Sequence, residues 1–472
     1  MKKEFVKEIA DINADFPQWY TDVVIKTGLA DYGPTKGSMV IRPYGYAIWE
    51  NIQRELDARF KATGHKNAYF PLLIPMSLLQ KEAEHVEGFA PEVATVTRAG
   101  SNELSEPLVV RPTSETIICD MYSRWIQSYR DLPLKINQWA NVVRWEKTTR
   151  PFLRTSEFLW QEGHTVHATR EEAEKETLDI LHLYADFARD CLAMPVLIGQ
   201  KTEKEKFAGA EETYGMEAMM QDGKSLQAGT THHFGDKFAR AYDIQFLDRD
   251  GTHKYAWQTS WGVSTRLIGA LIMAHGDARG LILPPAVAPV QAIVLPIAIH
   301  KAGVEEAARS VIDRLVRAQT DYSENSPGWK FNEWEMKGVP LRLEIGPRDI
   351  ENGVVTVVRR DNGEKSVVKN EELEGVIKRL LSDVHESMYR KAEAFRDSRI
   401  KEAHTLDELK KYLDEGNFVK AMWCGSQECE LKVKELMQAT IRIMPFDQTP
   451  IDDKCIADGS PAKKLVIFAR AY

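Results

Sequence analysis

Two arginines place the first constraint on the fold of this chain. Arg144 and Arg154 lie in otherwise apolar, strand-like stretches, where a charged side chain is costly unless an opposite charge pairs with it. A nucleoside triphosphate is a suitable partner, because planar guanidinium groups match phosphate oxygens. The sequence has neither a P-loop nor a G-x-G-x-x-G turn beside a predicted strand. It therefore predicts an ATP site that is built from arginines carried on strands.

Three separated segments share this pattern of polar residues. The first runs from Arg144–Glu146 to Pro151–Phe158, the second is Gln227–His233, and the third is Ser260–Arg266. An arginine and an acid on one strand, a loop with a returning strand, and a later strand–helix unit with an arginine follow one another. This arrangement resembles motifs 2 and 3 of the class II aminoacyl-tRNA synthetases.

A third class II element precedes these segments. A helical pattern with Ile48, Ile52, Leu56 and Phe60 at four-residue spacing runs into the strand-like Ala68–Ile74, and together they resemble motif 1. Because this helix and strand form the subunit interface in the family, the resemblance implies a homodimer.

Further segments resemble the prolyl-tRNA synthetases of the archaeal/eukaryotic type. These segments are Arg111–Glu115, Phe158–His164 and Thr202–Gly209. The resemblance extends from about Asp15 to Tyr472. About a hundred residues separate Glu157 from Gly262, too few for the inserted editing domain of the bacterial type. The chain therefore resembles the insertion-free type with a C-terminal extension.

The length and the hydrophobic patterns predict an α+β protein of three domains. A chain of 472 residues suggests about three domains of ordinary size. Residues 1–285 mix helices with an antiparallel sheet, and the resemblance makes them the class II catalytic domain. Residues 286–400 read as an α/β domain, which the resemblance identifies as anticodon-binding. Residues 401–472 form a small α/β C-terminal domain in which zinc is a candidate ligand.

Several elements are specific enough to be checked. The first domain should contain strands at 244–246 and 255–260, joined through an Asp250-Gly251 turn. The second should open with strand 292–299 and an amphipathic helix from 304 to 315. Later expected elements are strands 340–345, 354–359 and 464–468, a turn at Asn362-Gly363, and a helix that begins near Glu371.

Composition excludes some classes of protein. Gly280–Ile299 is apolar and long enough to span a bilayer of ~30 Å, but four prolines within it forbid a continuous helix. We therefore expect a domain linker there and no membrane segment. The N-terminus lacks an apolar signal core, and five cysteines in so long a chain favour a reducing cytosol. A net charge of −8 allows tRNA binding only through a local basic surface.

The ATP-binding residues follow from the reaction that the resemblance implies. Amino-acid activation is the attack of a carboxylate on the α-phosphate of ATP, so the protein mainly positions two anions and neutralises charge. Arg144 is expected at the α-phosphate and carboxylate, and Arg266 at the γ-phosphate, as the two catalytic residues. Magnesium is expected to bridge phosphate oxygens. The other family positions that contact ATP are Glu146, Thr155, Gln227 and Thr230.

A pocket for L-proline needs an acid for the ammonium and an apolar wall for the ring. Glu115 and Glu162 are the candidate acids, with Thr113 beside the first, and Trp160 and Phe207 are candidates for the wall. Family pocket positions are His164, His232 and Ser260.

Two features near the pocket have alternative interpretations. For the histidines the alternative is a role in the core or at a cap, and zinc binding by His232 and His233 is disfavoured because adjacent residues rarely reach one ion. The mixed-charge Lys201–Lys206 is by itself typical of a solvated loop. The resemblance makes it a loop over the active site.

Four residues of the second domain match family positions that read anticodon bases. They are Phe331, Glu335, Arg342 and Lys365. Single-stranded bases are read by stacking and by hydrogen bonds to their edges, and arginine and lysine favour guanine. The resemblance therefore implies that tRNA(Pro) is bound here.

The C-terminal domain contains a possible zinc site. Cys424, Cys429 and Cys455 could place three thiolates around one ion, and Asp458 could complete a tetrahedron. The alternative is three buried thiols that pack a small domain.

The resemblance implies ATP-dependent attachment of L-proline to tRNA(Pro) in two steps through prolyl-adenylate. One alternative is a class II synthetase for another amino acid, such as threonine or serine; Thr113–Glu115 and Trp160–His164 argue against it. Another is a non-catalytic, synthetase-like tRNA-binding subunit, which should have lost Arg144, Glu146 or Arg266.

Overall fold

A large antiparallel sheet is the centre of the first region in the computed structural model, which describes residues 8–85 and 93–472. Its strands lie in the order β3 (Lys66–Asn67), β7 (Leu134–Val143), β8 (Glu157–His167), β14 (Trp257–Ser264), β11 (Ser225–Gly235), β10 (Glu212–Met219) and β9 (Val196–Gln200). All neighbours are antiparallel except β3 and β7.

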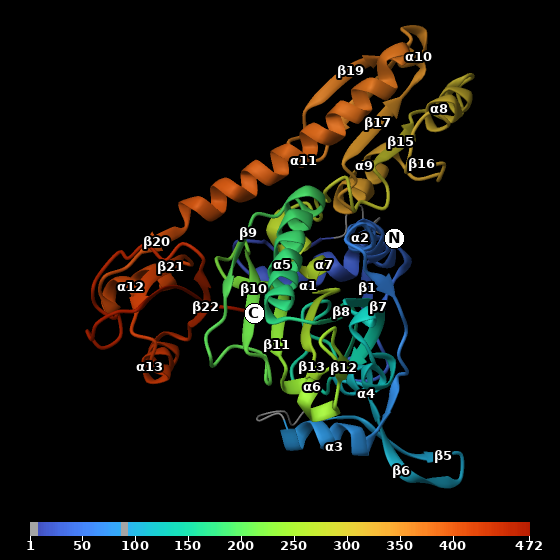
Figure 1. Cartoon of the computed structure of the whole chain (residues 1–472). Coiled ribbons are helices and arrows are strands. Elements are labelled where there is room, and N and C mark those ends of the chain that lie inside the picture. The colour runs from blue at the N-terminus through green and yellow to red at the C-terminus, as the bar shows by residue number, and fades with distance from the viewer. Residues whose placement is uncertain (1–7, 86–92) are drawn as a thin grey trace.

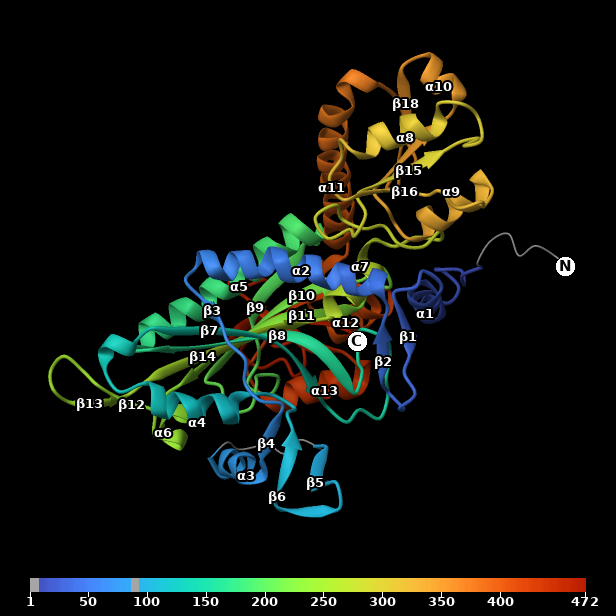
Figure 2. The same cartoon turned by 90° about the vertical axis from the view of Figure 1, so that its right-hand side faces the viewer.

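Helices cover both faces of this sheet, as Figure 2 shows. One face packs on α1 (Phe16–Lys26), α2 (Pro43–Ala62), α5 (Arg170–Leu192) and α7 (Arg266–His275), in a core that contains Trp49, Tyr184 and Trp261. A second hydrophobic core is formed with α3 (Met76–His85), α4 (Glu115–Trp125) and α6 (Lys237–Tyr242). The remaining elements are β1 (Ala30–Tyr32), β2 (Met39–Ile41), β4 (Leu73–Pro75), β5 (Thr95–Ala99), β6 (Asn102–Val110), η1 (Tyr129–Asp131), β12 (Gln245–Leu247) and β13 (His253–Tyr255).

The predicted motif 1 helix is confirmed, but its strand is not continuous. Helix α2 begins with Pro43 at its first turn, where a missing N–H costs nothing, and its predicted apolar residues are all buried. The expected strand 68–74 is wrong, since β3 ends at Asn67 and β4 begins at Leu73. Pro71 lies between them and has no N–H to donate to a sheet.

The second region is a five-stranded sheet with helices. Its strand order is β16 (Ala318–Thr320), β15 (Ala292–Pro296), β17 (Leu341–Ile345), β18 (Val354–Arg359) and β19 (Lys365–Lys369). The helices are α8 (Val304–Ile312), α9 (Pro327–Met336), α10 (Pro347–Glu351), η2 (Asn370–Glu372) and α11 (Leu373–Ser398). The predicted elements are confirmed, although β15 and α8 each end three residues early. Among the described residues, no helix is both long and apolar enough to cross a membrane.

The third region joins its sheet to the first. It contains β20 (Ile400–Glu402), α12 (Leu406–Asp414), β21 (Phe418–Trp423), α13 (Gln427–Met437), β22 (Thr440–Pro445) and β23 (Lys464–Ala469). Met444 of β22 pairs with Gln200 of β9, so the two sheets form one sheet of eleven strands. Figure 1 shows α11 crossing from the second region to the third. The α+β fold class is confirmed.

A buried ion pair connects the first and second regions. Arg360, whose side chain is 2% exposed, donates to both carboxylate oxygens of Asp277 at 2.9 and 2.7 Å, and to the carbonyl of Glu335. Burial alone would raise the pKa of Asp277, but the Arg360 guanidinium outweighs it and holds the pKa below its ordinary value.

Replacing Asp277 by alanine should destabilise the protein strongly, because Arg360 would remain buried without a partner. We expect a loss of about 3–5 kcal/mol in unfolding free energy near neutral pH. Because the folded pKa of Asp277 is depressed, this stabilisation is complete above the ordinary aspartate pKa of about 3.9 and is lost as the pH falls below it. Chemical unfolding across that range measures the difference.

The matched control is Arg279→Ala, since Arg279 contacts the same carboxylate at 3.6 Å but is 49% exposed. An exposed pair contributes only about 0–1 kcal/mol. Equal losses for the two variants would contradict the dominant role of the buried pair.

Candidate active site

A cavity of about 260 Å³ lies against the central sheet. The cross-strand register places Thr213, His232, Ser260 and His164 side by side on β10, β11, β14 and β8, so these side chains point to one face. All four line the cavity. Of these four, His232, Ser260 and His164 were predicted, and the further predicted residues that line the cavity are Thr113, Glu115, Arg144, Trp160, Glu162, Phe207, Gln227, Thr230 and Arg266.

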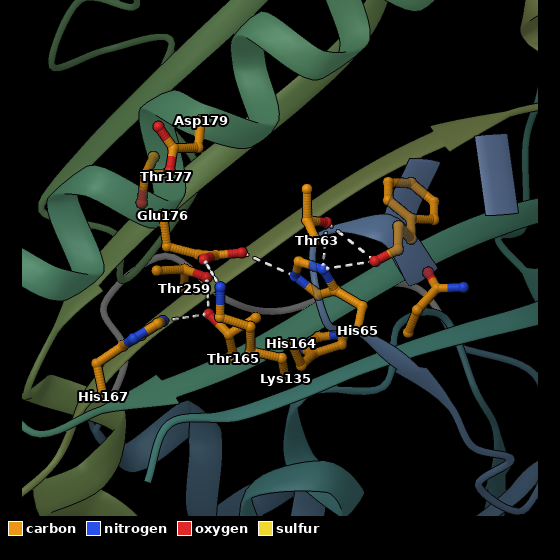
Figure 3. A network of polar contacts seen from close by, with 12 residues as sticks. Thr63, His65, Lys135, His164, Thr165, His167, Glu176, Thr177, Asp179 and Thr259 are labelled. Atoms are coloured by element: carbon orange, nitrogen blue, oxygen red, sulfur yellow. Dashed lines mark hydrogen bonds and ion pairs between the residues drawn. The ribbon is translucent and has the colours of Figure 1, made fainter. Parts of the chain in front are cut away.

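The neighbouring row of residues points to the opposite face, under α5. There Glu176 accepts from Lys135 and lies 2.7 Å from His65 Nε2, while Thr165 contacts Thr259 and His167 (Figure 3). His233 pairs with Thr259 across the strands and therefore belongs to this row. His232 and His233 thus face opposite sides of the sheet, which excludes one metal ion bound by both.

The two predicted catalytic arginines line the cavity, and their side chains are only partly shielded from solvent. Arg144 donates to the carbonyl of Pro112 at 3.0 Å, and its guanidinium lies 5.3 Å from the Trp160 ring centroid. Arg266 begins α7 and donates to the carbonyl of Leu153 at 3.2 Å. Burial lowers the pKa of both groups. Within residues 8–85 and 93–472, neither forms an ion pair within 4.0 Å, so the cavity suits a multiply charged anion.

The prediction that Arg144 and Arg154 lie within strands needs correction. Strand β7 ends at Val143, so Arg144 lies just beyond the strand, where its side chain can turn into the cavity. Arg154 belongs to a turn before β8, has a side chain 53% exposed, and lies 3.8 Å from Glu146. The chain turns there because Pro151 and a left-handed Phe152 interrupt the extended backbone.

Glu146 and Thr155 are the two predicted ATP residues that do not line the cavity. Glu146 faces Arg154, and the Thr155 hydroxyl donates to the carbonyl of Glu157 at 2.6 Å. Both belong to the hairpin that carries Arg144, so their role in binding stays a prediction.

The two candidate acids differ in how fully they are already bonded. Glu162 accepts hydrogen bonds from Ser114, Gln138 and His164 at 2.6, 2.8 and 3.0 Å. Burial would raise its pKa, but the His164 contact and these donors lower it. Glu115 accepts from the Thr113 hydroxyl through Oε2, and no hydrogen bond from a described residue reaches its Oε1. Glu115 therefore has more capacity to accept a bond from a ligand.

The ring of His232 is neutral, because burial lowers its pKa to about 3. Its Nδ1 lies 2.9 Å from the Thr213 hydroxyl, which also accepts a hydrogen bond from the backbone N–H of Phe207. A neutral imidazole has one donor nitrogen and one acceptor nitrogen, so His232 can make one bond of each kind.

Sequence analysis did not single out several residues that line the cavity, among them Phe158, Thr213 and Lys201. Phe158 lies within the quoted motif. The solvated-loop interpretation of Lys201–Lys206 is wrong for its first residue, because the Lys201 side chain is 2% exposed and paired with Glu217.

The predicted anticodon residues also come together. The Arg342 guanidinium lies 4.3 Å from the Phe331 ring centroid, and Arg342 lines a small cavity with Glu335. Arg342 and Lys365 both pair with Val358 across neighbouring strands, so their side chains share one face of the sheet.

In the third region the predicted metal ligands form one cluster. A ligand atom from each of Cys424, Cys429, Cys455 and Asp458 lies within 4.8 Å of the others. Three thiols and a carboxylate at these separations fit a tetrahedral zinc site. Cys429 and Cys455 also belong to the hydrophobic core, so packing remains the alternative.

Family comparisons agree with this arrangement along the chain. Residues 96–275 match the profile described as "tRNA synthetase class II core domain (G, H, P, S and T)", and residues 291–380 match "Anticodon binding domain". Residues 406–472 match "Prolyl-tRNA synthetase, C-terminal". The fold and its cavity are those of a class II aminoacyl-tRNA synthetase.

Full-length relatives define the family more narrowly. The chain is 59% identical to a proline–tRNA ligase of Alkaliphilus oremlandii (strain OhILAs) and 58% identical to one of Clostridium novyi (strain NT), in each case over 100% of this chain and 99% of that protein. A crystal structure of prolyl-tRNA synthetase from Cryptosporidium parvum, complexed with halofuginone and AMPPNP, has a TM-score of 0.94 and 42% identity, and the match covers 98% of this chain and 99% of that one. The chain belongs to the prolyl-tRNA synthetase family.

Proposed function

We propose that this chain is a proline–tRNA ligase that attaches L-proline to tRNA(Pro) through prolyl-adenylate. The observation that carries the proposal is the lining of one cavity. The guanidinium groups of Arg144 and Arg266, which have no ion-pair partner among the described residues, line it together with Glu115, an acid with an open oxygen. The guanidinium groups can hold phosphates, and the acid can hold a substrate ammonium. The names of the full-length relatives support proline, rather than threonine or serine, as the amino acid.

Arg144 and Arg266 would act mainly by position and charge. Arg144 would hold the α-phosphate and the attacking carboxylate, and Arg266 the γ-phosphate, with Glu146, Thr155, Gln227 and Thr230 as further contacts to ATP. Bound Mg²⁺ would neutralise phosphate charge. Such charge stabilisation is the main requirement of acyl-phosphate formation, so no side chain needs to act as a nucleophile.

Replacing Arg144 by alanine should nearly abolish proline-dependent ATP–pyrophosphate exchange. A group that stabilises charge in the transition state contributes roughly 10²–10³-fold in kcat. Arg342→Ala is the control: it lies in the second region, so exchange should be unchanged while aminoacylation of tRNA(Pro) falls. Exchange within about tenfold of wild type for Arg144→Ala would contradict the ATP-site assignment.

The proline pocket is proposed to contain Thr113, Glu115, Trp160, Glu162, His164, His232 and Ser260. We assign the ammonium of proline to Glu115, because the carboxylate of Glu162 is already bonded to three protein donors. His164 and His232 would then shape the pocket, and Trp160 and Phe207 would contact the ring.

Glu115→Gln should raise KM for proline at least about thirtyfold, since losing one partner of a buried charge pair costs ~2 kcal/mol or more. Pyrophosphate exchange at varied proline measures it. Glu162→Gln is the comparison, and it should lower thermal stability with a smaller change in KM. A larger rise in KM for Glu162→Gln would reverse the assignment.

Three domains are proposed from the sequence boundaries: a catalytic domain at 1–285, an anticodon-binding domain at 286–400 and a C-terminal domain at 401–472. The matched profiles fall inside these boundaries. Phe331, Glu335, Arg342 and Lys365 are proposed to contact the anticodon. The face that Arg342 and Lys365 share, and the contact of Arg342 with Phe331, support this.

The subtype is proposed to be the archaeal/eukaryotic one, without an editing insertion. The short interval between β8 and β14, which holds only α5, β9 to β13 and α6, supports this proposal. A homodimer through α2 is also proposed, and sedimentation of the purified chain would test it. Five free cysteines are compatible with a cytoplasmic location.

We propose that Cys424, Cys429, Cys455 and Asp458 bind one structural Zn²⁺ ion. Protein purified without chelator should contain about one equivalent of zinc per chain, as a closed four-ligand site requires. Cys424→Ser should lose the metal, whereas Cys119→Ser, a buried thiol of the first region, should retain it. Zinc well below one equivalent in the wild-type protein would favour the packing interpretation.

A further inference from the structure

Three charged side chains form a buried cluster between the first and third regions. Lys201 Nζ donates to Glu217 at 2.6 Å and to the backbone carbonyl of Arg442 at 2.7 Å. Arg442 donates to both carboxylate oxygens of Glu217 at 3.2 Å, and the Ser225 hydroxyl adds a bond of 2.6 Å. The side chains of Lys201, Glu217 and Arg442 are 2%, 0% and 10% exposed.

This cluster adjoins the proposed nucleotide contacts. Across β10 and β11, Glu217 lies opposite Gln227, and Gly215 lies opposite Thr230. Lys201 passes over Gly215, where a Cβ atom would be only 2.6 Å from Lys201 Cε. Glycine at that position therefore leaves the space in which Lys201 reaches the cavity wall.

The cluster has one excess positive charge. Two cations share one carboxylate, and Lys201 lines the same cavity as Arg266. Burial lowers the pKa of Arg266, and the charges of Arg154, Arg144 and Arg442 lower it further while Glu217 opposes them. The cluster and Arg266 therefore interact electrostatically, and an anion bound between them would be favoured by both.

The second cation comes from the third region, and the fold fixes its position. Arg442 lies on β22, whose pairing with β9 sets the distance between the two regions. A second buried contact connects the same parts, because the Thr202 hydroxyl donates to Glu430 at 3.0 Å. Lys201 and Thr202 are thus both held from the third region, at the beginning of the loop that carries Glu205 and Phe207 to the cavity.

We propose that Arg442 is a positioning residue for ATP, acting from the C-terminal domain through Glu217 and Lys201. It holds Lys201 against the cavity wall and maintains the excess positive charge beside Gln227 and Thr230. This inference rests on the proposed function, since it assigns ATP to that cavity.

The test is steady-state pyrophosphate exchange with the full chain and varied ATP. Arg442→Met leaves a neutral Lys201–Glu217 pair and no uncompensated charge, so the variant should fold. We expect KM for ATP to rise about tenfold, with kcat and KM for proline within about threefold of wild type. Arg442→Lys restores the charge and should return KM for ATP to within about threefold of wild type.

A double variant separates charge from simple destabilisation. Glu217→Gln combined with Arg442→Met again has one excess positive charge, on Lys201, and should recover most of the lost ATP affinity. The matched control is Arg470→Met, because Arg470 is an arginine of the same region that pairs with Asp414 and contacts none of the three residues. It should leave both KM values within about twofold of wild type.

Three results would overturn the inference. They are an unchanged KM for ATP in Arg442→Met, a fall in kcat alone that follows the fraction of folded protein, and a double variant whose folded fraction has a KM for ATP no lower than that of Arg442→Met. Wild-type protein without proline-dependent exchange would instead overturn the proposed function.

Discussion

Positive charge gathered at one cavity, where Arg144 and Arg266 have no counter-ion within 4.0 Å among the described residues, is the constraint on which the rest of this structure depends. Arg144 and Arg266 line the same cavity, and Lys201 with Arg442 adds one more excess charge at its wall. A folded protein tolerates such a group only when backbone carbonyls and aromatic rings hold it, as Pro112, Leu153 and Trp160 do here. A bound polyanion would complete this arrangement.

The antiparallel register gives the sheet two different faces, and only one of them lines the cavity. Side chains on paired strands point alternately to opposite faces, so one row gives Thr213, His232, Ser260 and His164 to the cavity. The next row goes to the packing with α5, where His65 and Lys135 meet Glu176. A shift of one residue in register would exchange the two rows and turn the cavity residues toward α5.

Local sequence predicted the elements and most of the cavity, because both are encoded in short segments. The spacing of Ile48 to Phe60 specified α2, and twelve of the predicted side chains line the cavity. Prediction was wrong where the backbone is interrupted, or where a residue distant in the sequence determines how far a side chain is buried. Pro71 interrupted a strand, and the turn at Phe152 moved Arg154 to the surface. Lys201 seemed solvated because Arg442, which covers it, follows 241 positions later.

The eleven-stranded sheet has a consequence for how the chain can be shortened. Its two edge strands are β20, of three residues, and β3, of two residues. Strands this short expose few unpaired backbone groups. Removing the third region would leave β9, a strand of five residues, as a new open edge with free N–H and C=O groups. Such an edge can recruit strands from other molecules. The C-terminal region therefore also protects the catalytic sheet from aggregation, and it cannot be treated as a detachable module.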